Sequence, residues 1–216
     1  MLRRYLPSLA LLGALGAVVL TAGFLPARPA TSSVRAVPAA DLRSAMRKLW
    51  EDHITWTRLY IVSAAANLPE KNATAARLLR NQDDIGNAIK PFYGDAAGTQ
   101  LTALLKGHIM IATEIEDAAM KGEQARLTSA SARWTANADS IAVFLNKANP
   151  SNWPLPTLKS MLHSHLDLTT QEVVAHLHKD WPADIAAYDR VHDEILTMAD
   201  ALSSGIAKQF PDKVMK

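Results

Sequence analysis

Four histidines stand at similar depths in long helical patterns. His53, His108, His165 and His192 each follow the start of such a pattern by roughly ten to twelve residues. In an antiparallel helical bundle the midpoints of all helices lie at one level, whichever way each helix runs. We therefore expect these four imidazoles to converge in one layer at mid-bundle, with Trp134 at the same level on another helix.

Neutral imidazole nitrogens bind Zn, Cu and Fe, and a bundle interior is a usual place for such a site. A second polar row, with spacings of four, three and four residues, should share the dry side of one helix; it comprises His165, Thr169, Glu172 and His176. Glu172 is the one carboxylate there, so its ionised form needs a cation, either a protonated histidine or a metal ion. The candidate metal ligands are His53, His108, His165, His192, Glu172 and His176.

Two alternatives to a metal ion remain open. The same layer could hold a small ligand, or it could be a purely structural network, because a buried neutral histidine donates from one nitrogen and accepts at the other. Residues expected to supply partners or to line a ligand or cofactor site are Trp50, Thr57, Tyr60, Trp134, Asn137 and Thr169.

Several chemistries lack their sequence signature. No Glu-x-x-His pair faces the expected core; Asp189 and His192 have that spacing, but Asp189 should be exposed, so a ferritin-like di-iron site is not expected. Phosphate loops, nucleophile elbows, dinucleotide-binding glycines and haem-attachment motifs do not occur. The absence of cysteine excludes disulfides, thiolate metal sites and cysteine nucleophiles. These observations favour a binding protein over an enzyme.

The elements that would position these residues are helices. From Asp41 onward the apolar residues recur with a period of 3.6. Five long stretches and one short one are expected at about 41–67, 75–90 (short, ended by Pro91), 96–121, 123–147, 155–178 and 180–210, where Asp180 caps the last and Pro182 lies in its first turn. Because the loops are short, we predict an all-α, up-and-down antiparallel bundle.

Helical projection assigns faces to these residues. His53 and Thr57 fall on the apolar side of the first helix, whereas Glu51 and Arg58 fall on the opposite, solvated side. Glu116 lies at the border of its helix's apolar stripe. The polar cluster NQDDIGN, residues 81–87, is expected on the surface, although it could line a cleft.

The N-terminus carries a targeting pattern. The basic start MLRR precedes an apolar run that reaches residue 25, which predicts either an export signal or a membrane anchor. Residues 26–40 are expected to be a Pro/Ala/Ser linker, residues 41–210 the bundle domain and residues 211–216 a tail. We therefore expect an extracytoplasmic domain, periplasmic or at the cell surface, with a membrane contact through residues 5–25 if the segment is retained.

Length and composition agree with one globular domain. The chain has 216 residues, of which 49% are apolar and 20% are charged, enough to bury a sizeable core. The formal net charge of +2 offers no electrostatic case for nucleic acid as a partner.

Several stretches resemble an uncharacterised family of bacterial exported helical-bundle proteins. The similarity is carried by LWEDHITWTRLYI, LLRNQDDIGNAIKPFYG, LLKGHIMIA, ANPSNWP and AYDRVHDEILTMADALSSGIAKQFP. The resemblance implies bacterial export and a helical fold, and it assigns no activity. The function expected from the sequence is therefore an extracytoplasmic binding protein with a buried histidine layer that holds a metal ion or small ligand; the alternative is a structural or interaction module without a ligand.

Overall fold

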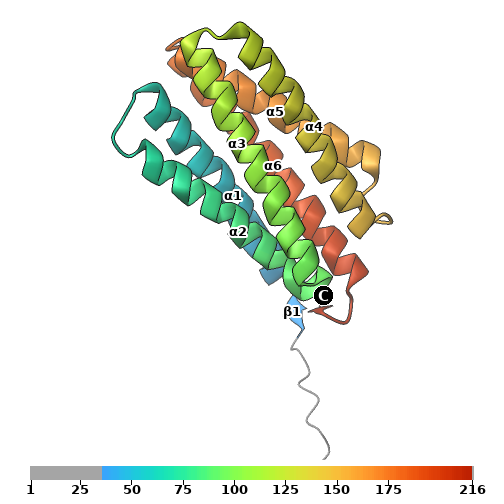
Figure 1. The fold of residues 1–216 in the computed structure, drawn as a ribbon. Helices are drawn as coiled ribbons and strands as arrows, with labels where there is room; N and C mark the ends of the chain where they lie inside the picture. Colours follow the sequence, from blue (N-terminus) through green and yellow to red (C-terminus); the bar gives the residue numbers. More distant parts are fainter. Residues whose placement is uncertain (1–35, 216) are drawn as a thin grey trace, which may run out of the picture. The chain divides into compact units, whose positions relative to one another are not determined.

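The computed structural model describes residues 36–215 and has six long helices in that range. Their bounds are α1 Ala39–Ala65, α2 Lys71–Tyr93, α3 Asp95–Lys121, α4 Gln124–Ala148, α5 Leu155–Leu177 and α6 Trp181–Gln209. Two two-residue strands, β1 Val37–Pro38 and β2 Val214–Met215, flank them. The predicted all-α bundle is confirmed (Figure 1).

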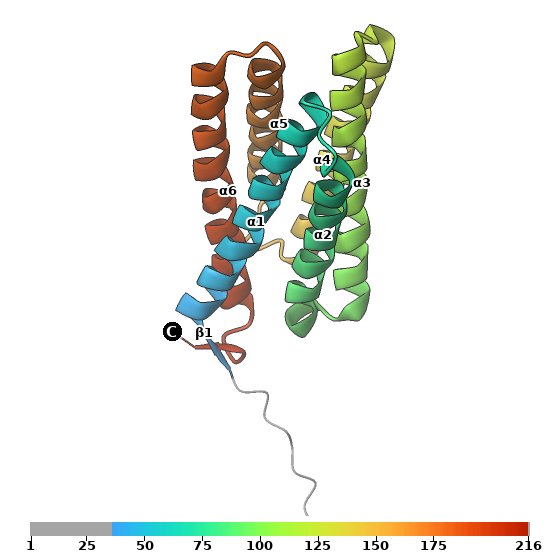
Figure 2. The ribbon, with the colours of Figure 1, turned by 90° about the vertical axis from the view of Figure 1, so that its left-hand side faces the viewer.

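Each helix packs against the next one in the chain, and α6 packs against α1, which closes the ring of helices. The helices alternate in direction, as expected for short connections (Figure 1). In Figure 2, α1 crosses the bundle obliquely from α6 at its start toward α2 at its end. Because of this position α1 contacts α2, α5 and α6, and more of its circumference is covered than one apolar stripe would require.

The prediction that the second helix is short is wrong. α2 runs for 23 residues, as many as α5, and Pro91 lies inside its last turn instead of ending it. The extra first turn is held to α1 by a hydrogen bond between the hydroxyls of Thr74 and Ser63, 3.0 Å apart. Two predicted ends are confirmed: α3 stops at Gly122, whose φ of +69° suits glycine, and Asp180 caps α6 by accepting from Ala183 N at 3.2 Å.

The core is an apolar column along the bundle axis. Ile54, Ile141 and Ile195 are each at most 2% exposed, and the aromatic side chains of Trp50 and Trp134 are also buried in it. Burying an isoleucine of this kind contributes roughly 1.5–3 kcal/mol. The column holds the helices in register, and it is interrupted near its middle by the polar residues described below.

The two ends of the bundle domain meet in a small parallel sheet. Val37 pairs with Val214 and Pro38 with Met215, and Val214 is buried against the core. The end of the predicted linker and residues 214–215 of the predicted tail thus join the domain expected at 41–210. The predicted targeting segment, residues 1–25, lies outside the described residues. Within residues 36–215, none of the helices is long and apolar enough to cross a bilayer.

Candidate functional site

Three of the four mid-helix histidines meet inside the bundle. His53 on α1, His108 on α3 and His165 on α5 are 4%, 4% and 5% exposed. The ring centroid of His165 lies 5.8 Å from that of His53 and 6.4 Å from that of His108. Trp134 on α4 packs on His108, with 5.1 Å between ring centroids. We call His53, His108 and His165 the three-histidine cluster.

Two rings of the cluster have a fixed proton position. Asn137 donates its amide to Leu104 O at 3.1 Å, so its Oδ1 faces His108 and accepts from Nδ1 of that ring at 3.0 Å. His165 Nδ1 donates to the Glu194 carboxylate at 3.0 Å. In both rings the hydrogen bond places an N–H at Nδ1, so Nε2 carries the lone pair when the ring is neutral.

The third ring is held the opposite way. Gln82 Nε2 lies 2.9 Å from Leu78 O, 3.1 Å from Asn81 Oδ1 and 3.2 Å from His53 Nδ1. The amide nitrogen thus shares its hydrogens among three acceptors, and His53 Nδ1 is one of them. The proton of His53 is then on Nε2, so the cluster presents one N–H donor and two lone pairs.

Burial keeps His53 and His108 uncharged. Desolvation, reinforced by the neighbouring His165, lowers the pKa of His108 to about 3. The same cause, together with His165 and His108, holds the pKa of His53 well below its usual range. Both rings are therefore neutral at physiological pH, the form in which an imidazole acts as a ligand or as a hydrogen-bonding group.

The placement of His192 in this layer is wrong. It lies on the flank of α6, its side chain is 33% exposed, and its Nε2 is 3.2 Å from Glu51 Oε1 on α1. In the part of the chain that the structure describes, no three His, Asp or Glu side chains form a group that could hold a metal ion. The six candidate ligands are thus split among the cluster, the surface and a separate ionic site.

That ionic site contains Glu172 and His176. Glu172 is 1% exposed, as expected, but its cation is Arg58, whose Nη1 is 2.9 Å from Glu172 Oε1. Arg58 also binds Asp184 through Nη1 and Nη2, and His176 Nδ1 lies 2.9 Å from Asp184 Oδ2. The expectation that Arg58 is solvated is therefore wrong: from the half-buried edge of α1 it binds two buried carboxyl groups.

The pKa values of this site follow from its contacts. Burial raises the pKa of Glu172 although Arg58 opposes the shift. Burial would also raise the pKa of Asp184, but hydrogen bonds from Arg58 and His176 outweigh it and hold that pKa below its usual value. One fixed cation and a mainly ionised Asp184 thus form a closed pair, which suits a structural role.

A pocket of about 410 Å³ lies beside the three-histidine cluster, in the half of the bundle remote from β1 and β2. Its walls come from the second halves of α1, α3 and α5 and from the first halves of α2 and α4. Among the predicted ligand residues, Thr57, Tyr60, Trp134 and Thr169 line it, whereas Trp50 packs on His53 and Asn137 binds His108. The volume is in the range of pockets that hold small organic molecules.

Three buried polar atoms in the pocket wall have no hydrogen-bond partner among residues 36–215. They are Glu116 Oε1, Trp134 Nε1 and Thr169 Oγ1. Burial, with smaller effects of Glu172 and Asp117 that outweigh Lys71, raises the pKa of Glu116 to about 8. Glu116 is thus a neutral acid at pH 7. Such unsatisfied groups cost free energy in a folded protein, so each needs an explanation.

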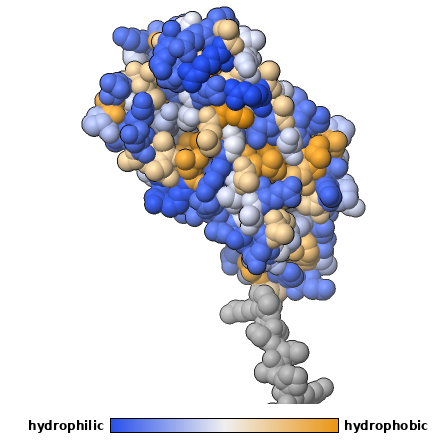
Figure 3. All heavy atoms as spheres, in the orientation of Figure 1, coloured by the Kyte–Doolittle hydropathy of each residue, from blue (hydrophilic) through white to orange (hydrophobic). Residues whose placement is uncertain are grey.

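Exposed residues mark the mouth of the pocket along α4 and α5. Gln124, Thr128 and Ser131 are exposed on α4, and Val174 is 46% exposed on α5. The space-filling view shows hydrophobic patches breaking through a largely hydrophilic surface on one face of the bundle (Figure 3).

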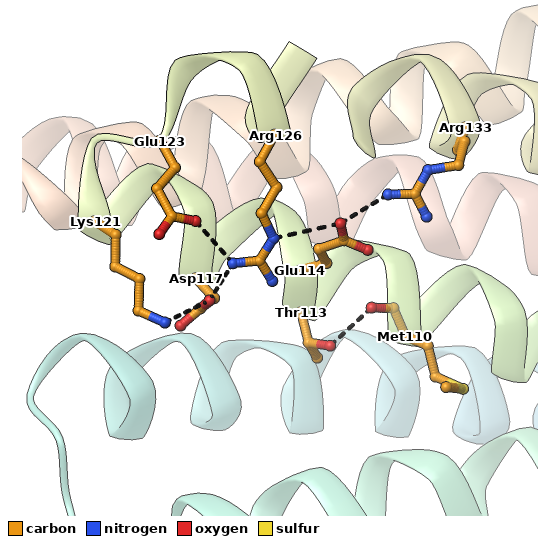
Figure 4. A network of polar contacts seen from close by, with 8 residues as sticks. All are labelled: Met110, Thr113, Glu114, Asp117, Lys121, Glu123, Arg126 and Arg133. Carbon is orange, nitrogen blue, oxygen red and sulfur yellow. Dashed lines mark hydrogen bonds and ion pairs between the residues drawn. The ribbon is translucent and has the colours of Figure 1, made fainter. Parts of the chain in front are cut away.

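An ionic network fixes α3 against α4 at this end of the bundle. Arg126 of α4 contacts Glu114, Asp117 and Glu123, and Arg133 reaches Glu114 at 2.8 Å (Figure 4). These residues are largely solvent-accessible, so each pair contributes little to stability. Their joint effect is to hold the two helices that carry the pocket's α3 and α4 walls.

The sequence did not predict the roles of Gln82, Glu194, Asp184 and Glu116. Gln82 and Asn81, within the cluster expected on the surface, are fully buried. The apolar residues Leu78, Ile85 and Ile89, which recur seven and then four positions apart, mark the inward face of α2, and Gln82 lies in that row, four positions after Leu78 and three before Ile85. That spacing was the available signal for Gln82; Glu194 and Asp184 offered none.

Comparison with known proteins found no match: no protein-family model, no curated protein and no solved structure matches this chain. The site therefore has to be interpreted from its own geometry.

Proposed function

We propose that this protein binds a small organic molecule in the pocket between α1, α3, α4 and α5. The observation that carries the proposal is the coincidence of a 410 Å³ pocket with three unpaired buried polar atoms in its wall. A ligand that fills the pocket and hydrogen-bonds to Glu116 and Thr169 would remove the empty apolar surface and two of the three unsatisfied groups. The location is proposed to be extracytoplasmic, on the strength of the basic start and apolar run in residues 1–25.

Blocking the mouth tests the proposal. Ser131 is exposed and lines the pocket, so Ser131→Trp should cover the entrance without disturbing the core. Ala132, the next residue on α4, is exposed and outside the pocket lining, so Ala132→Trp is the matched control. Binding of octanol, measured by titration calorimetry, should weaken at least tenfold in Ser131→Trp only. Equal octanol binding by all three proteins would refute the pocket as a binding site, as would a wild type that binds none of octanol, octylamine and octanoate.

A metal ion at the three-histidine cluster is the second candidate. In its favour, His108 and His165 form hydrogen bonds through Nδ1, and their Nε2 atoms have no partner among the described residues. Metal-bound histidines commonly donate from one ring nitrogen to an oxygen and bind the metal with the other. Against it, His53 has its proton on Nε2. For all three imidazoles to bind a metal ion, the proton of His53 must move from Nε2 to Nδ1. Gln82 must then rotate its amide so that Oε1, which is unpaired, accepts from His53 Nδ1, and the contacts of Gln82 to Leu78 and Asn81 are lost.

Thermal melts with a chelator, and then with added Zn²⁺ or Cu²⁺, test the metal. A bound ion stabilises the folded state by mass action. The metal is supported by a rise in melting temperature in the wild type and in His192→Ala, a surface control, that disappears in His108→Ala. Melts that do not respond to metal in any of the three proteins would leave the cluster as a structural network.

A further inference from the structure

We propose that the ligand of this pocket is a lipophilic amine, an apolar molecule with one protonated amino group, and that Glu116 recognises that group. The inference rests on the proposed function, because it concerns the same pocket. It starts from the chemistry of the wall.

The wall is apolar apart from a few groups. Its aliphatic part includes Ile61, Leu78, Ile109, Leu127 and Val173, which would cover a hydrocarbon chain. Glu116 is the only carboxyl group among the lining residues, and none of the described lining residues is Lys, Arg or His. An anionic ligand would therefore enter without a counter-charge, whereas a cation would gain one when Glu116 gives up its proton.

Glu116 is placed to take a donor from the ligand. The residue is 3% exposed, and its Oε1 is a buried atom without a partner in residues 36–215. The charged groups that act on it from the surrounding helices are Lys71 of α2, Glu172 of α5 and Asp117 of α3, and Tyr60 of α1 lies close enough to be affected by it. Lys71 makes no hydrogen bond or ion pair with Glu116, so the carboxyl remains available.

The two aromatic rings in the wall suit the same ligand. Tyr60 and Trp134 line the pocket together with Glu116, and aromatic faces attract ammonium groups. A carboxylate opposite an ammonium group makes a charge-assisted hydrogen bond, about twice as strong as one between neutral groups.

The proton balance gives a distinctive signature. At pH 7 the free Glu116 carries its proton, because its pKa is about 8, and the free amine is an ammonium ion. In the complex the carboxyl group and the amine together hold one proton fewer than they do apart, as either a carboxylate with an ammonium ion or a carboxylic acid with a neutral amine. Binding should therefore release about one proton to the buffer. Below the pKa of Glu116, affinity should rise about tenfold for each unit by which the pH increases.

Calorimetry with matched probes tests this inference. Octylamine, octanol and octanoate share one hydrocarbon chain and differ in the head group. At pH 7 we expect octylamine to bind the purified protein at least tenfold more tightly than octanol, and octanoate to bind more weakly than both. Titrations in phosphate and in Tris, which differ in ionisation enthalpy, should reveal the released proton with octylamine and none with octanol.

Two variants assign the effect to Glu116. Glu116→Gln retains the size of the side chain and removes the titrating proton, so it should lose at least tenfold in octylamine affinity, release no proton and bind octanol as the wild type does. Glu70→Gln, at an exposed carboxyl outside the pocket lining, is the control and should behave as the wild type.

The possible failures are distinct. Equal binding of octylamine and octanol by the wild type, tighter binding of octanoate, or an amine preference that survives in Glu116→Gln would overturn the inference and leave a binding pocket for neutral or anionic molecules. Absence of binding by all three probes would overturn both the inference and the proposed function. Unchanged octanol binding by Glu116→Gln serves as the check that this variant is folded.

Discussion

Two buried groups make the stability of the bundle depend on pH in opposite directions. Burial lowers the pKa of His108 from 6.5 to about 3, so below pH 6.5 the unfolded chain takes up a proton that the folded protein does not, and stability falls with falling pH. His53 acts in the same direction. Burial raises the pKa of Glu116 from 4.5 to about 8, so stability falls as pH rises from 4.5 to 8.

Glu116 offsets the effect of His108 in the acidic range, whereas His53 adds to that of His108. Between pH 6.5 and 4.5 proton uptake by His108 in the unfolded chain lowers the free energy of unfolding by about 2 kcal/mol, and Glu116 raises it by a similar amount. A wild-type profile taken alone would not separate these contributions. The difference between the wild type and a variant of one group isolates that group.

The variant His108→Asn is suited to this measurement. Its Nδ2 can replace His108 Nδ1 as the donor to Asn137, and it does not titrate. The unfolding free energy of the wild type minus that of this variant should be about 2 kcal/mol smaller at pH 4.5 than at pH 6.5. Urea unfolding followed by circular dichroism, with chelator in every buffer, gives both free energies.

His178→Asn, which removes an exposed imidazole, is the control and should leave the profile as in the wild type. If the difference between the wild type and His108→Asn stays constant within about 0.5 kcal/mol over this range, then His108 titrates as readily in the folded state as in the unfolded chain, and the reasoning fails.

Three other substitutions follow from the same contacts. The unfolding free energy of Glu116→Gln minus that of the wild type should be about 3 kcal/mol larger at pH 7 than at pH 4.5. Urea titrations at the two pH values measure this difference. A difference that does not depend on pH would show that Glu116 is ionised in the folded protein. Arg58→Met leaves Glu172 and Asp184 buried without their cation and should lower the unfolding free energy by about 3–5 kcal/mol at neutral pH. Arg43→Met, at the exposed pair with Asp200, should lower it far less. Equal urea midpoints for the two variants would argue against a buried ionic site. Gly86→Ala would place a methyl group 2.7 Å from Gly98 O, where α2 and α3 cross, and should lower stability by about 1–3 kcal/mol. Gly107→Ala should be tolerated, because the nearest neighbour of its methyl group would be 3.5 Å away. Thermal melts that show no loss of stability for Gly86→Ala would mean that the two helices can move apart.

Periodicity predicted the fold and half of the site. An apolar stripe fixes which side of each helix faces inward, and short loops fix the alternation of direction, so the depth of His53, His108 and His165 in their helices was enough to bring them together. Their convergence follows from those two facts and needs no knowledge of contacts.

The errors concern residues at the edges of stripes. How wide the buried arc of a helix is depends on how many helices surround it. α1 has three neighbours, so the arc extends to Arg58, which helical projection placed on the solvated side. On α6 the arc ends short of His192, whose side chain is 33% exposed. Projection of a single helix cannot give this width.

Pairings between helices were beyond prediction for a different reason. The bond between Gln82 and His53, and that between Arg58 and Asp184, depend on the axial offset of two helices and on their crossing angles. These are set by the packing of many side chains at once. A sequence pattern identifies a polar residue on an inward face, as it could have done for Gln82, but it does not identify the partner.

The parallel pairing of β1 with β2 determines how this domain can be attached to anything else. Val37 and Val214 lie side by side, so the chain enters and leaves the bundle at one end, while the pocket occupies the opposite half. An affinity tag fused after residue 215, or a linkage before residue 36, would therefore start from the end of the bundle away from the mouth between α4 and α5. Immobilised through its C-terminus on a sensor surface, the domain would present that mouth to the solution, and the binding measurements above could be made on it in that orientation.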